Sequence, residues 1–280
     1  MQLYETITGL RQALDPQRKA GVSIGFVPTM GALHAGHLAL VEASKARNDL
    51  TVCSIFVNPT QFNNPDDLAR YPHTLEADCQ LLEAVGCDLV FAPSVEEMYP
   101  GSPVLRLDFG ELETVLEGAF RPGHFNGVGI VVSKLFNIVQ PDRAYFGQKD
   151  LQQVAVVRRL IRDLGFPLEL VRMPIVRETD GLAMSSRNRN LSPAERQVAP
   201  ALHQALNKAR AVLQEEGPIE AAKIAVNDYL QAYSAFRLEY FEVTNAETLQ
   251  PVEQLQAPGA TALCIAAYLG QTRLIDNLIV

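Results

Sequence analysis

The chain has 280 residues, of which 48% are hydrophobic and 20% charged, a composition typical of a folded globular protein. The formal net charge of −8 argues against general nucleic-acid binding, which needs a broad basic surface. No apolar run approaches the ~20 residues of a membrane-spanning helix, and no secretion signal is expected from the first residues. The four cysteines form no C-x-x-C pair, so we expect buried, reduced thiols in a reducing cytoplasm.

Strand-like and helix-like patterns alternate through the first 175 residues. The run at 50–57 is almost wholly apolar and rich in β-branched residues, as in a parallel strand that is buried on both faces. Strands are expected at 22–27, 50–57, 88–91, 144–146 and 168–171, and helices at 36–47, 74–85, 127–139 and 151–164. This alternation predicts a doubly wound, parallel α/β sheet.

The pattern changes near residue 175 and predicts a second, smaller α+β domain, so the expected domains are 1–175 and 176–280. Ser192 followed by Pro193 is typical of a helix N-terminus, and helical periodicity continues to about residue 213. A second helix is expected at 219–233. Strands are expected at 237–243, 261–268 and 272–279, and the apolar run at 274–280 could be a core strand or an interface.

The segment between the first expected strand and the next helix carries two histidines, His34 and His37, and two glycines, Gly31 and Gly36. In open α/β sheets, ligands bind at the carboxyl ends of the strands, and glycine lets the backbone approach them closely. The helix N-terminus favours an anion. The two imidazoles could donate hydrogen bonds to phosphate oxygens. They could instead bind a metal, although no third ligand is close in sequence.

Two short motifs resemble the nucleotidyltransferase superfamily, which has a Rossmann-like fold. His34-Ala35-Gly36-His37 is similar to its H-x-G-H signature, and members direct a nucleophile at the α-phosphate of ATP and release pyrophosphate. Met184-Ser185-Ser186-Arg187 is similar to the second ATP signature, with Ala183 in place of its first lysine and Ser186-Arg187 in place of its closing Lys-Ser. Such hydroxyl and cationic groups can hold a triphosphate, whereas a polar surface loop is the alternative interpretation.

Five blocks occur in the order found in the pantothenate synthetase family: Gly25–His34, Ser54–Phe62, Arg121–Phe125, Phe146–Asp150 and Met184–Arg187. This resemblance covers nearly the whole chain. It implies ATP-dependent formation of pantothenate from pantoate and β-alanine, through a pantoyl adenylate, with AMP and pyrophosphate as products. It also implies a Rossmann-like first domain that carries the site, a smaller second domain that covers it, and a cytoplasmic homodimer formed through the first domain.

The resemblance also assigns roles to individual residues. His34, His37 and Lys149 are expected to be catalytic, by stabilising charge on the phosphates. Gln61 is expected to contact pantoate and β-alanine, Gln153 pantoate, and Asn58 β-alanine. The expected ATP-binding residues are Met30, Gly31, Ala32, Leu33, His34, Ala35, Gly36, His37, Gly147, Gln148, Lys149, Asp150, Val176, Met184, Ser185, Ser186 and Arg187.

Three further residues are candidate substrate contacts. Arg121 and His124 flank a stiff Pro-Gly turn, and Arg121 could pair with a carboxylate. Tyr71 could support the site, although a packed aromatic residue is the alternative. No direct protein ligand for a metal is expected, because Mg²⁺ would bridge phosphate oxygens of ATP.

The chemistry leaves two alternatives beside amide formation. A carboxylate and an amine need activation to condense, and without a nucleophilic Ser or Cys constellation an acyl adenylate is the natural intermediate. The first alternative is an adenylyltransferase that keeps AMP on its product, and the second is a nucleotide sensor without turnover. A tRNA synthetase is disfavoured by the acidic balance and by the lack of an anticodon-sized domain.

Overall fold

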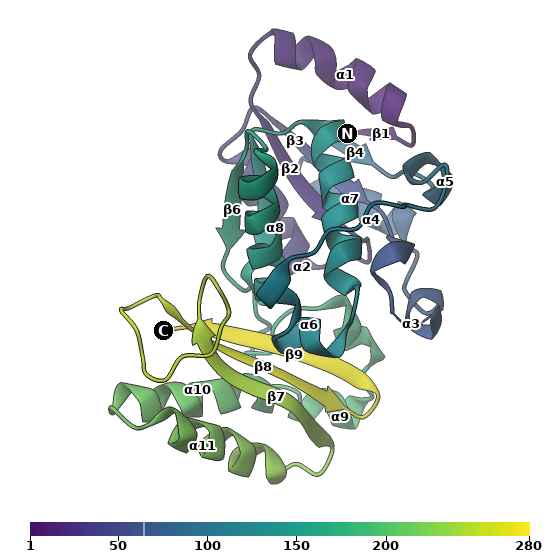
Figure 1. Ribbon diagram of the computed structural model, residues 1–280. Helices are drawn as coiled ribbons and strands as arrows, with labels where there is room; N and C mark the ends of the chain where they lie inside the picture. Colours follow the sequence, from purple (N-terminus) through teal and green to yellow (C-terminus); the bar gives the residue numbers. More distant parts are fainter. Residues whose placement is uncertain (64) are drawn as a thin grey trace.

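A six-stranded parallel sheet forms the larger part of the molecule in the computed structural model, which describes residues 1–63 and 65–280 (Figure 1). The spatial order of its strands is β1-β4-β3-β2-β5-β6, and every pair runs parallel. The strands are β1 (Gln2–Tyr4), β2 (Ile24–Thr29), β3 (Leu50–Ile55), β4 (Leu89–Phe91), β5 (Arg143–Gly147) and β6 (Glu169–Met173). The predicted doubly wound, Rossmann-like sheet is confirmed.

Helices cover both faces of this sheet. Phe26 and Val27 are neighbours on β2 and point to opposite faces, so each packs into a different apolar core. The core around Phe26 includes α1 (Ile7–Lys19), α7 (His124–Val139) and α8 (Leu151–Leu164), whereas the core around Val27 includes α2 (Ala35–Lys45) and α4 (Leu75–Ala84). The short elements between them are η1 (Pro59–Gln61), α3 (Pro65–Ala69), α5 (Val95–Met98), η2 (Gly110–Glu113), α6 (Leu116–Phe120) and η3 (Gln148–Asp150).

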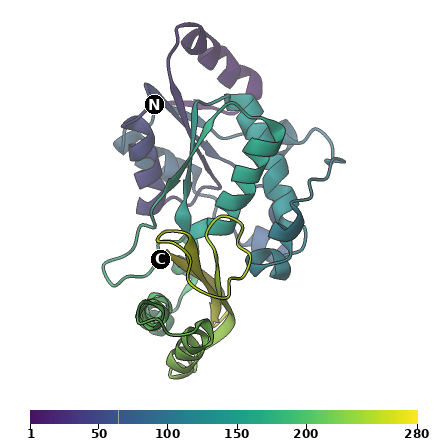
Figure 2. The same cartoon turned by 60° about the vertical axis from the view of Figure 1, so that its left-hand side comes forward.

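A three-stranded antiparallel sheet forms the smaller, C-terminal unit, which lies below the parallel sheet in Figures 1 and 2. Its strands are β7 (Phe236–Asn245), β8 (Thr261–Leu269) and β9 (Thr272–Ile279). Helices α10 (Ala201–Gln214) and α11 (Ile219–Gln231) pack on one face, after η4 (Ser186–Asn190) and α9 (Pro193–Val198). The predicted α+β unit is thus observed, and the run at 274–280 is largely the core strand β9. The boundary at residue 175 stays a prediction.

Several local predictions differ from the structure. The helical pattern that was expected to continue to residue 213 forms two helices, α9 and α10. Pro200 lies between them, and because it has no backbone N–H, it cannot continue the hydrogen bonds of a single helix. Helix α7 begins at His124, earlier than expected, after Gly123 with its positive φ of 79°. All four cysteines are free, but Cys79 is only half-buried. None of the helices in the described part of the chain could span a membrane.

Candidate active site

The strand order places two functional turns side by side. Strand β2 lies between β3 and β5, while the helices that follow β2 and β5 cover opposite faces of the sheet. Such a point, where the winding direction reverses, opens a crevice at the carboxyl ends of the strands. The turn after β2 carries His34 and His37, and the turn after β5 carries Lys149. The topology therefore brings together residues that lie more than 100 positions apart in the chain.

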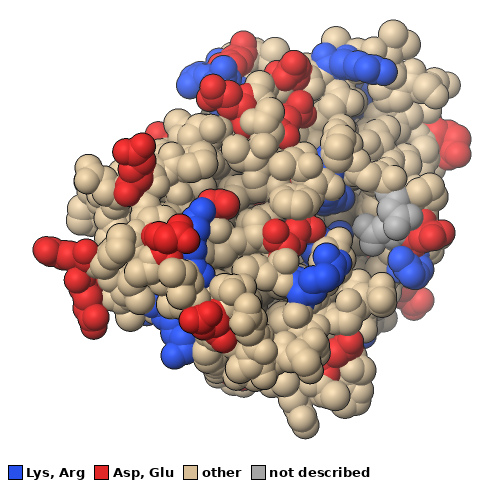
Figure 3. Space-filling view, turned by 60° about the horizontal axis from the view of Figure 1, so that its bottom comes forward, with Lys and Arg blue, Asp and Glu red and all other residues tan. Residues whose placement is uncertain are grey.

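A cleft of about 210 Å³ opens at this end of the sheet. Its wall on one side is apolar and comes from α7. Lys and Arg side chains are interspersed with Asp and Glu on the molecular face that Figure 3 shows. The predicted site residues that line the cleft are Met30, His34, Gly36, His37, Asn58, Gln61, Tyr71, Arg121, His124, Gly147, Lys149, Asp150, Gln153, Val176, Met184, Ser185, Ser186 and Arg187. Those that do not line it are Gly31, Ala32, Leu33, Ala35 and Gln148.

His34 is the N-cap of α2, and its geometry fixes its tautomer. Its Nδ1 accepts a hydrogen bond from the backbone N–H of Gly36 at 3.1 Å, so the proton of the neutral ring lies on Nε2. A Cβ on Gly36 would lie 2.9 Å from the ring, and glycine is therefore needed for this contact. Burial and the charge of Lys149 lower the pKa of His34 to about 4. His34 is thus a neutral donor near pH 7.

His37 lies one turn further along α2, and its ring centroid is 4.1 Å from that of His34. Burial, His34 and Lys149 lower the pKa of His37 well below its ordinary value. Its Nδ1 is buried and has no hydrogen-bond partner among the described residues. Since both rings are neutral, they suit hydrogen bonding to an anion better than proton donation from an imidazolium.

Asp78 supports the loop before these histidines, and its role is not visible in the sequence. Its side chain is 2% exposed. Its two carboxylate oxygens accept hydrogen bonds from the backbone N–H groups of Ala32 at 2.9 Å and Leu33 at 2.8 Å. Ala32 has a φ of 51°, a left-handed conformation that costs energy for a residue with a Cβ. Asp78 thus stabilises a strained turn from a neighbouring helix.

Asn58 and Gln61 form the far end of the cleft, at the carboxyl end of β3. Nδ2 of Asn58 donates to Oε1 of Gln61 at 3.0 Å and to the carbonyl of Gly127 at 3.2 Å. Oδ1 of Asn58 accepts from the hydroxyl of Tyr99 at 2.9 Å. These bonds tie the turn that carries Gln61 to helix α7. The β-alanine contact of Asn58 stays a prediction.

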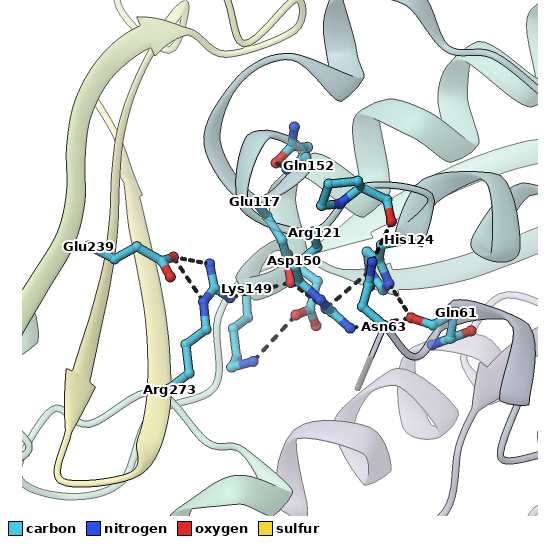
Figure 4. A network of polar contacts seen from close by, with 12 residues as sticks. Gln61, Asn63, Glu117, Arg121, His124, Lys149, Asp150, Gln152, Glu239 and Arg273 are labelled. Carbon is cyan, nitrogen blue, oxygen red and sulfur yellow. Dashed lines mark hydrogen bonds and ion pairs between the residues drawn. The ribbon is translucent and has the colours of Figure 1, made fainter. Parts of the chain in front are cut away.

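A buried ionic network borders this end of the cleft and joins the two units (Figure 4). One oxygen of Glu117 accepts from Arg121 at 2.6 Å and from Arg273 of β9 at 3.3 Å. Arg273 also pairs with Glu239 of β7 at 2.6 Å. Burial alone would raise the pKa of Glu117, but the positive charge of Arg121, of His124 when protonated, and of Arg273 lowers it to about 2. Glu117 is therefore ionised at neutral pH.

His124 extends this network to the turn that carries Gln61. Its Nδ1 lies 2.8 Å from the carbonyl oxygen of Gln61 and must donate to it, so the unprotonated Nε2 faces Arg121 at 3.3 Å. Burial and the charge of Arg121 lower the pKa of His124 to about 4. Protonation of Nε2 would place two donors and two positive charges face to face.

These shifts predict an acid-labile fold. His34 and His124 have folded-state pKa values near 4, below the value of 6.5 for unfolded histidine, so the unfolded chain binds more protons between these values. The stabilisation is complete above pH 6.5 and is lost as the pH falls toward 4. We expect a loss of roughly 1 to 2 kcal/mol for each histidine at pH 5. Urea unfolding at pH 7.5, 6 and 5 measures it, and a His124→Asn variant should show a weaker pH dependence. A constant stability over this range would contradict the prediction.

The segment that follows β6 closes the side of the cleft where the second predicted ATP motif lies. The backbone N–H of Met184 donates to the carbonyl of Val176 at 3.0 Å, so the chain turns back on itself between them. Ser185 is the N-cap of η4, and its hydroxyl accepts from the N–H of Arg187 at 3.3 Å. On the opposite wall, Lys149 is largely buried and its Nζ lies 3.4 Å from Asp150. The two predicted ATP segments thus face one cleft.

No group of three or more His, Cys, Asp or Glu side chains with metal-binding geometry occurs among the described residues. Asp150 is one carboxylate on the cleft wall, next to Lys149. This arrangement fits Mg²⁺, which usually keeps several waters and relies on substrate phosphates with one or two carboxylates.

Comparisons with known proteins show which family matches the chain. Residues 2–279 match the family model described as pantoate–β-alanine ligase. The pantothenate synthetase of Phocaeicola vulgatus is 51% identical over 279 residues, which is 99% of each chain, and that of Moorella thermoacetica is 50% identical over 281 residues, which is 100% of this chain and 98% of the relative.

Two solved structures extend the comparison. The pantothenate synthetase of Thermus thermophilus superposes with a TM-score of 0.94 at 48% identity, covering 100% of this chain and 99% of that one. The pantoate–β-alanine ligase of Francisella tularensis, complexed with "Beta-gamma ATP and Beta-alanine", has a TM-score of 0.79 at 35% identity and covers 100% and 97% of the two chains.

Proposed function

Since the chain belongs to the pantoate–β-alanine ligase family and its reaction is the ATP-dependent condensation of pantoate with β-alanine, we propose that this reaction passes through a pantoyl adenylate in the cleft described above. The observation that carries the proposal is the juxtaposition in one cleft of His34, His37 and Lys149 with the amide of Gln61. One end holds donors for phosphate oxygens, and the other holds neutral hydrogen-bonding groups for a hydroxy acid.

In the first step, the pantoate carboxylate attacks the α-phosphorus of ATP, and the bond to the bridging oxygen of pyrophosphate breaks. His34 and His37 donate hydrogen bonds to the phosphate oxygens as charge develops, and Lys149 adds a positive charge. Ser185, Ser186 and Arg187 hold the leaving pyrophosphate from the opposite wall. The backbone of Val176 contacts adenine, and those of the remaining predicted ATP-binding residues that line the cleft complete the nucleotide site.

In the second step, the amine of β-alanine attacks the acyl carbon, an amide bond forms as the nitrogen loses a proton to the departing phosphate, and AMP leaves with the electron pair of the carbon–oxygen bond. Gln61 and Gln153 orient the pantoyl group, and Asn58 helps to bind β-alanine. Arg121, His124 and Tyr71 lie on the cleft wall as further substrate contacts. The C-terminal unit excludes water, which otherwise hydrolyses the adenylate.

Mg²⁺, when bound together with ATP, would supply charge neutralisation at the phosphates, and Asp150 is the carboxylate that would help to hold it through a water. The four free cysteines support a reducing compartment such as the cytoplasm. The family resemblance supports a homodimer. Sedimentation velocity would report the mass of the assembly in solution.

Isotope exchange of labelled pyrophosphate into ATP tests the two-step scheme. With Mg²⁺ and without β-alanine, we expect exchange that depends on pantoate, because the adenylate forms reversibly. Addition of β-alanine should then release pantothenate and one AMP per amide bond. A protein that makes pantothenate but shows no pantoate-dependent exchange would contradict an adenylate formed as a separate, reversible step.

A further inference from the structure

Asn277 is a buried amide of the C-terminal unit that contacts the turn carrying Lys149. It lies on β9 and is 2% exposed. Its Nδ2 donates to the carbonyl of Gln148 at 2.9 Å and to that of Lys149 at 3.0 Å. Its Oδ1 accepts from Nε2 of Gln148 at 3.1 Å. One side chain from the second unit thus makes three hydrogen bonds with two successive residues at the cleft.

The turn after β5 receives no comparable support from its own side chains. Gly147, at the N-cap of η3, has no side chain, and Asp150, at the N-cap of α8, makes no side-chain capping bond. The side chain of Lys149 is long and flexible, so the backbone must be fixed before its ammonium group can be aimed. Asn277 supplies side-chain hydrogen bonds that this turn lacks.

Asn277 is itself held in place through its neighbour Asp276, which forms an ion pair with the segment that follows β6. Its backbone N–H donates to Oδ1 of Asp276 at 2.7 Å. The carboxylate of Asp276 accepts hydrogen bonds from both Nη atoms of Arg177, at 2.6 and 2.9 Å, in a bidentate geometry. Arg177 directly follows Val176 on the segment that leads to the Ser185-Ser186-Arg187 motif. Strand β9 therefore connects both segments that face the nucleotide.

We propose that Asn277 is a positioning residue for Lys149. By binding the carbonyls of residues 148 and 149, it sets the backbone from which Nζ of Lys149 reaches the phosphates. The second unit then contributes to the rate of phosphate chemistry as well as covering the site. This inference rests on the proposed function, in which Lys149 stabilises charge in the first step.

The test compares Asn277→Ala and Asn277→Ser with the unchanged protein in pantoate-dependent pyrophosphate exchange. A displacement of about 1 Å at a reacting group costs up to about 10²-fold, so we expect kcat to fall about 10- to 100-fold. KM for pantoate should change less than kcat, because Gln61 lies at the other end of the cleft and Gln153 is held by helix α8, beyond the turn. The serine variant keeps one hydrogen-bond donor, and it replaces the alanine variant in the comparison if the alanine variant does not fold.

A double-mutant cycle separates positioning from general support. If Asn277 acts through Lys149, then Asn277→Ala in a Lys149→Gln background should lower exchange by no more than about twofold. Equal costs in both backgrounds would overturn the proposal, as would Asn277 variants with unchanged kcat. No exchange by the unchanged protein, in contrast, would overturn the proposed function together with this inference.

Asn245 provides a matched control in the same sheet. It also makes three side-chain hydrogen bonds, to Gln256 and from the backbone of Glu247 and Thr248, but these lie in the turn that follows β7. Asn245→Ala should lower the urea midpoint without lowering kcat of exchange. A similar loss of kcat in both variants would mean that any weakening of this unit slows the reaction, and would contradict a specific role for Asn277.

Discussion

Replacement of Lys149 by glutamine is expected to lower kcat of pantothenate formation by about 10²- to 10³-fold, the usual cost of removing one preorganised group that stabilises transition-state charge. The ammonium group lies in a largely buried position on the cleft wall, where a charge is screened less than in water. Glutamine keeps much of the length and removes the charge. Initial rates of AMP release and pyrophosphate exchange measure the effect, and a loss below tenfold would contradict the role.

Lys45→Gln is the control for this variant. Lys45 pairs with Asp88 at 3.2 Å, and both side chains are about one-third exposed, so a change below twofold is expected.

The pKa values of His34 and His37 provide a second measurement on the Lys149→Gln variant. Because the charge of Lys149 helps to lower the pKa values of His34 and His37, its removal should raise both. Histidine NMR titrations of the folded protein follow this change.

Gly127→Ala is expected to raise KM for pantoate at least tenfold and to destabilise the fold by about 1 to 3 kcal/mol. A Cβ at this position would lie 2.3 Å from the carbonyl oxygen of Thr60 and 2.7 Å from Cα of Gln61. Both are backbone atoms, so helix α7 or the η1 turn has to move. Either movement changes how the turn that carries Gln61 lies against α7, and so affects the proposed pantoate contact. Steady-state kinetics measure the change in KM, and urea unfolding measures the loss of stability.

Gly129→Ala is the matched control on the same helix. Its Cβ would meet the side chains of Phe109 and Leu107, at 2.7 and 2.9 Å, and not the turn with Gln61. We therefore expect a loss of stability with KM for pantoate unchanged within about twofold. If both alanine variants raise KM equally, the effect of Gly127→Ala would be a general consequence of strain in α7.

The elements that the sequence predicted best are those with strong local patterns. Helix α8 begins and ends where its apolar periodicity predicts, at Leu151 and Leu164. Strand β1 and helix α1 were not predicted. Strand β1 has only three residues and lies at the sheet edge, and α1 has just two fully buried residues and contains Pro16. A three-residue strand carries too little signal for a local rule, whereas α1 has apolar residues at helical spacing and is disfavoured locally by Pro16.

The same division holds for the candidate site. His34, His37 and Lys149 could be predicted because each lies in a turn at the end of a parallel strand, where topology places ligands. Asp78 and Asn277 could not, because each acts through backbone groups that are distant in sequence. Asp78 is 45 residues from Leu33, and Asn277 is 128 residues from Lys149. The sequence alone does not show whether a polar residue in a helix or strand is buried or exposed.

The shared contact at Glu117 has a consequence for how the two units separate. Arg121 and Glu117 belong to the parallel-sheet unit and form one close pair, while Arg273 and Glu239 belong to the C-terminal unit and form another. Of these three ion pairs, the longer contact between Arg273 and Glu117 is the one that crosses between the units. If the C-terminal unit moved away, these four charges would remain as two neutral pairs. Breaking the contact between Arg273 and Glu117 would therefore leave neither partner without an opposite charge.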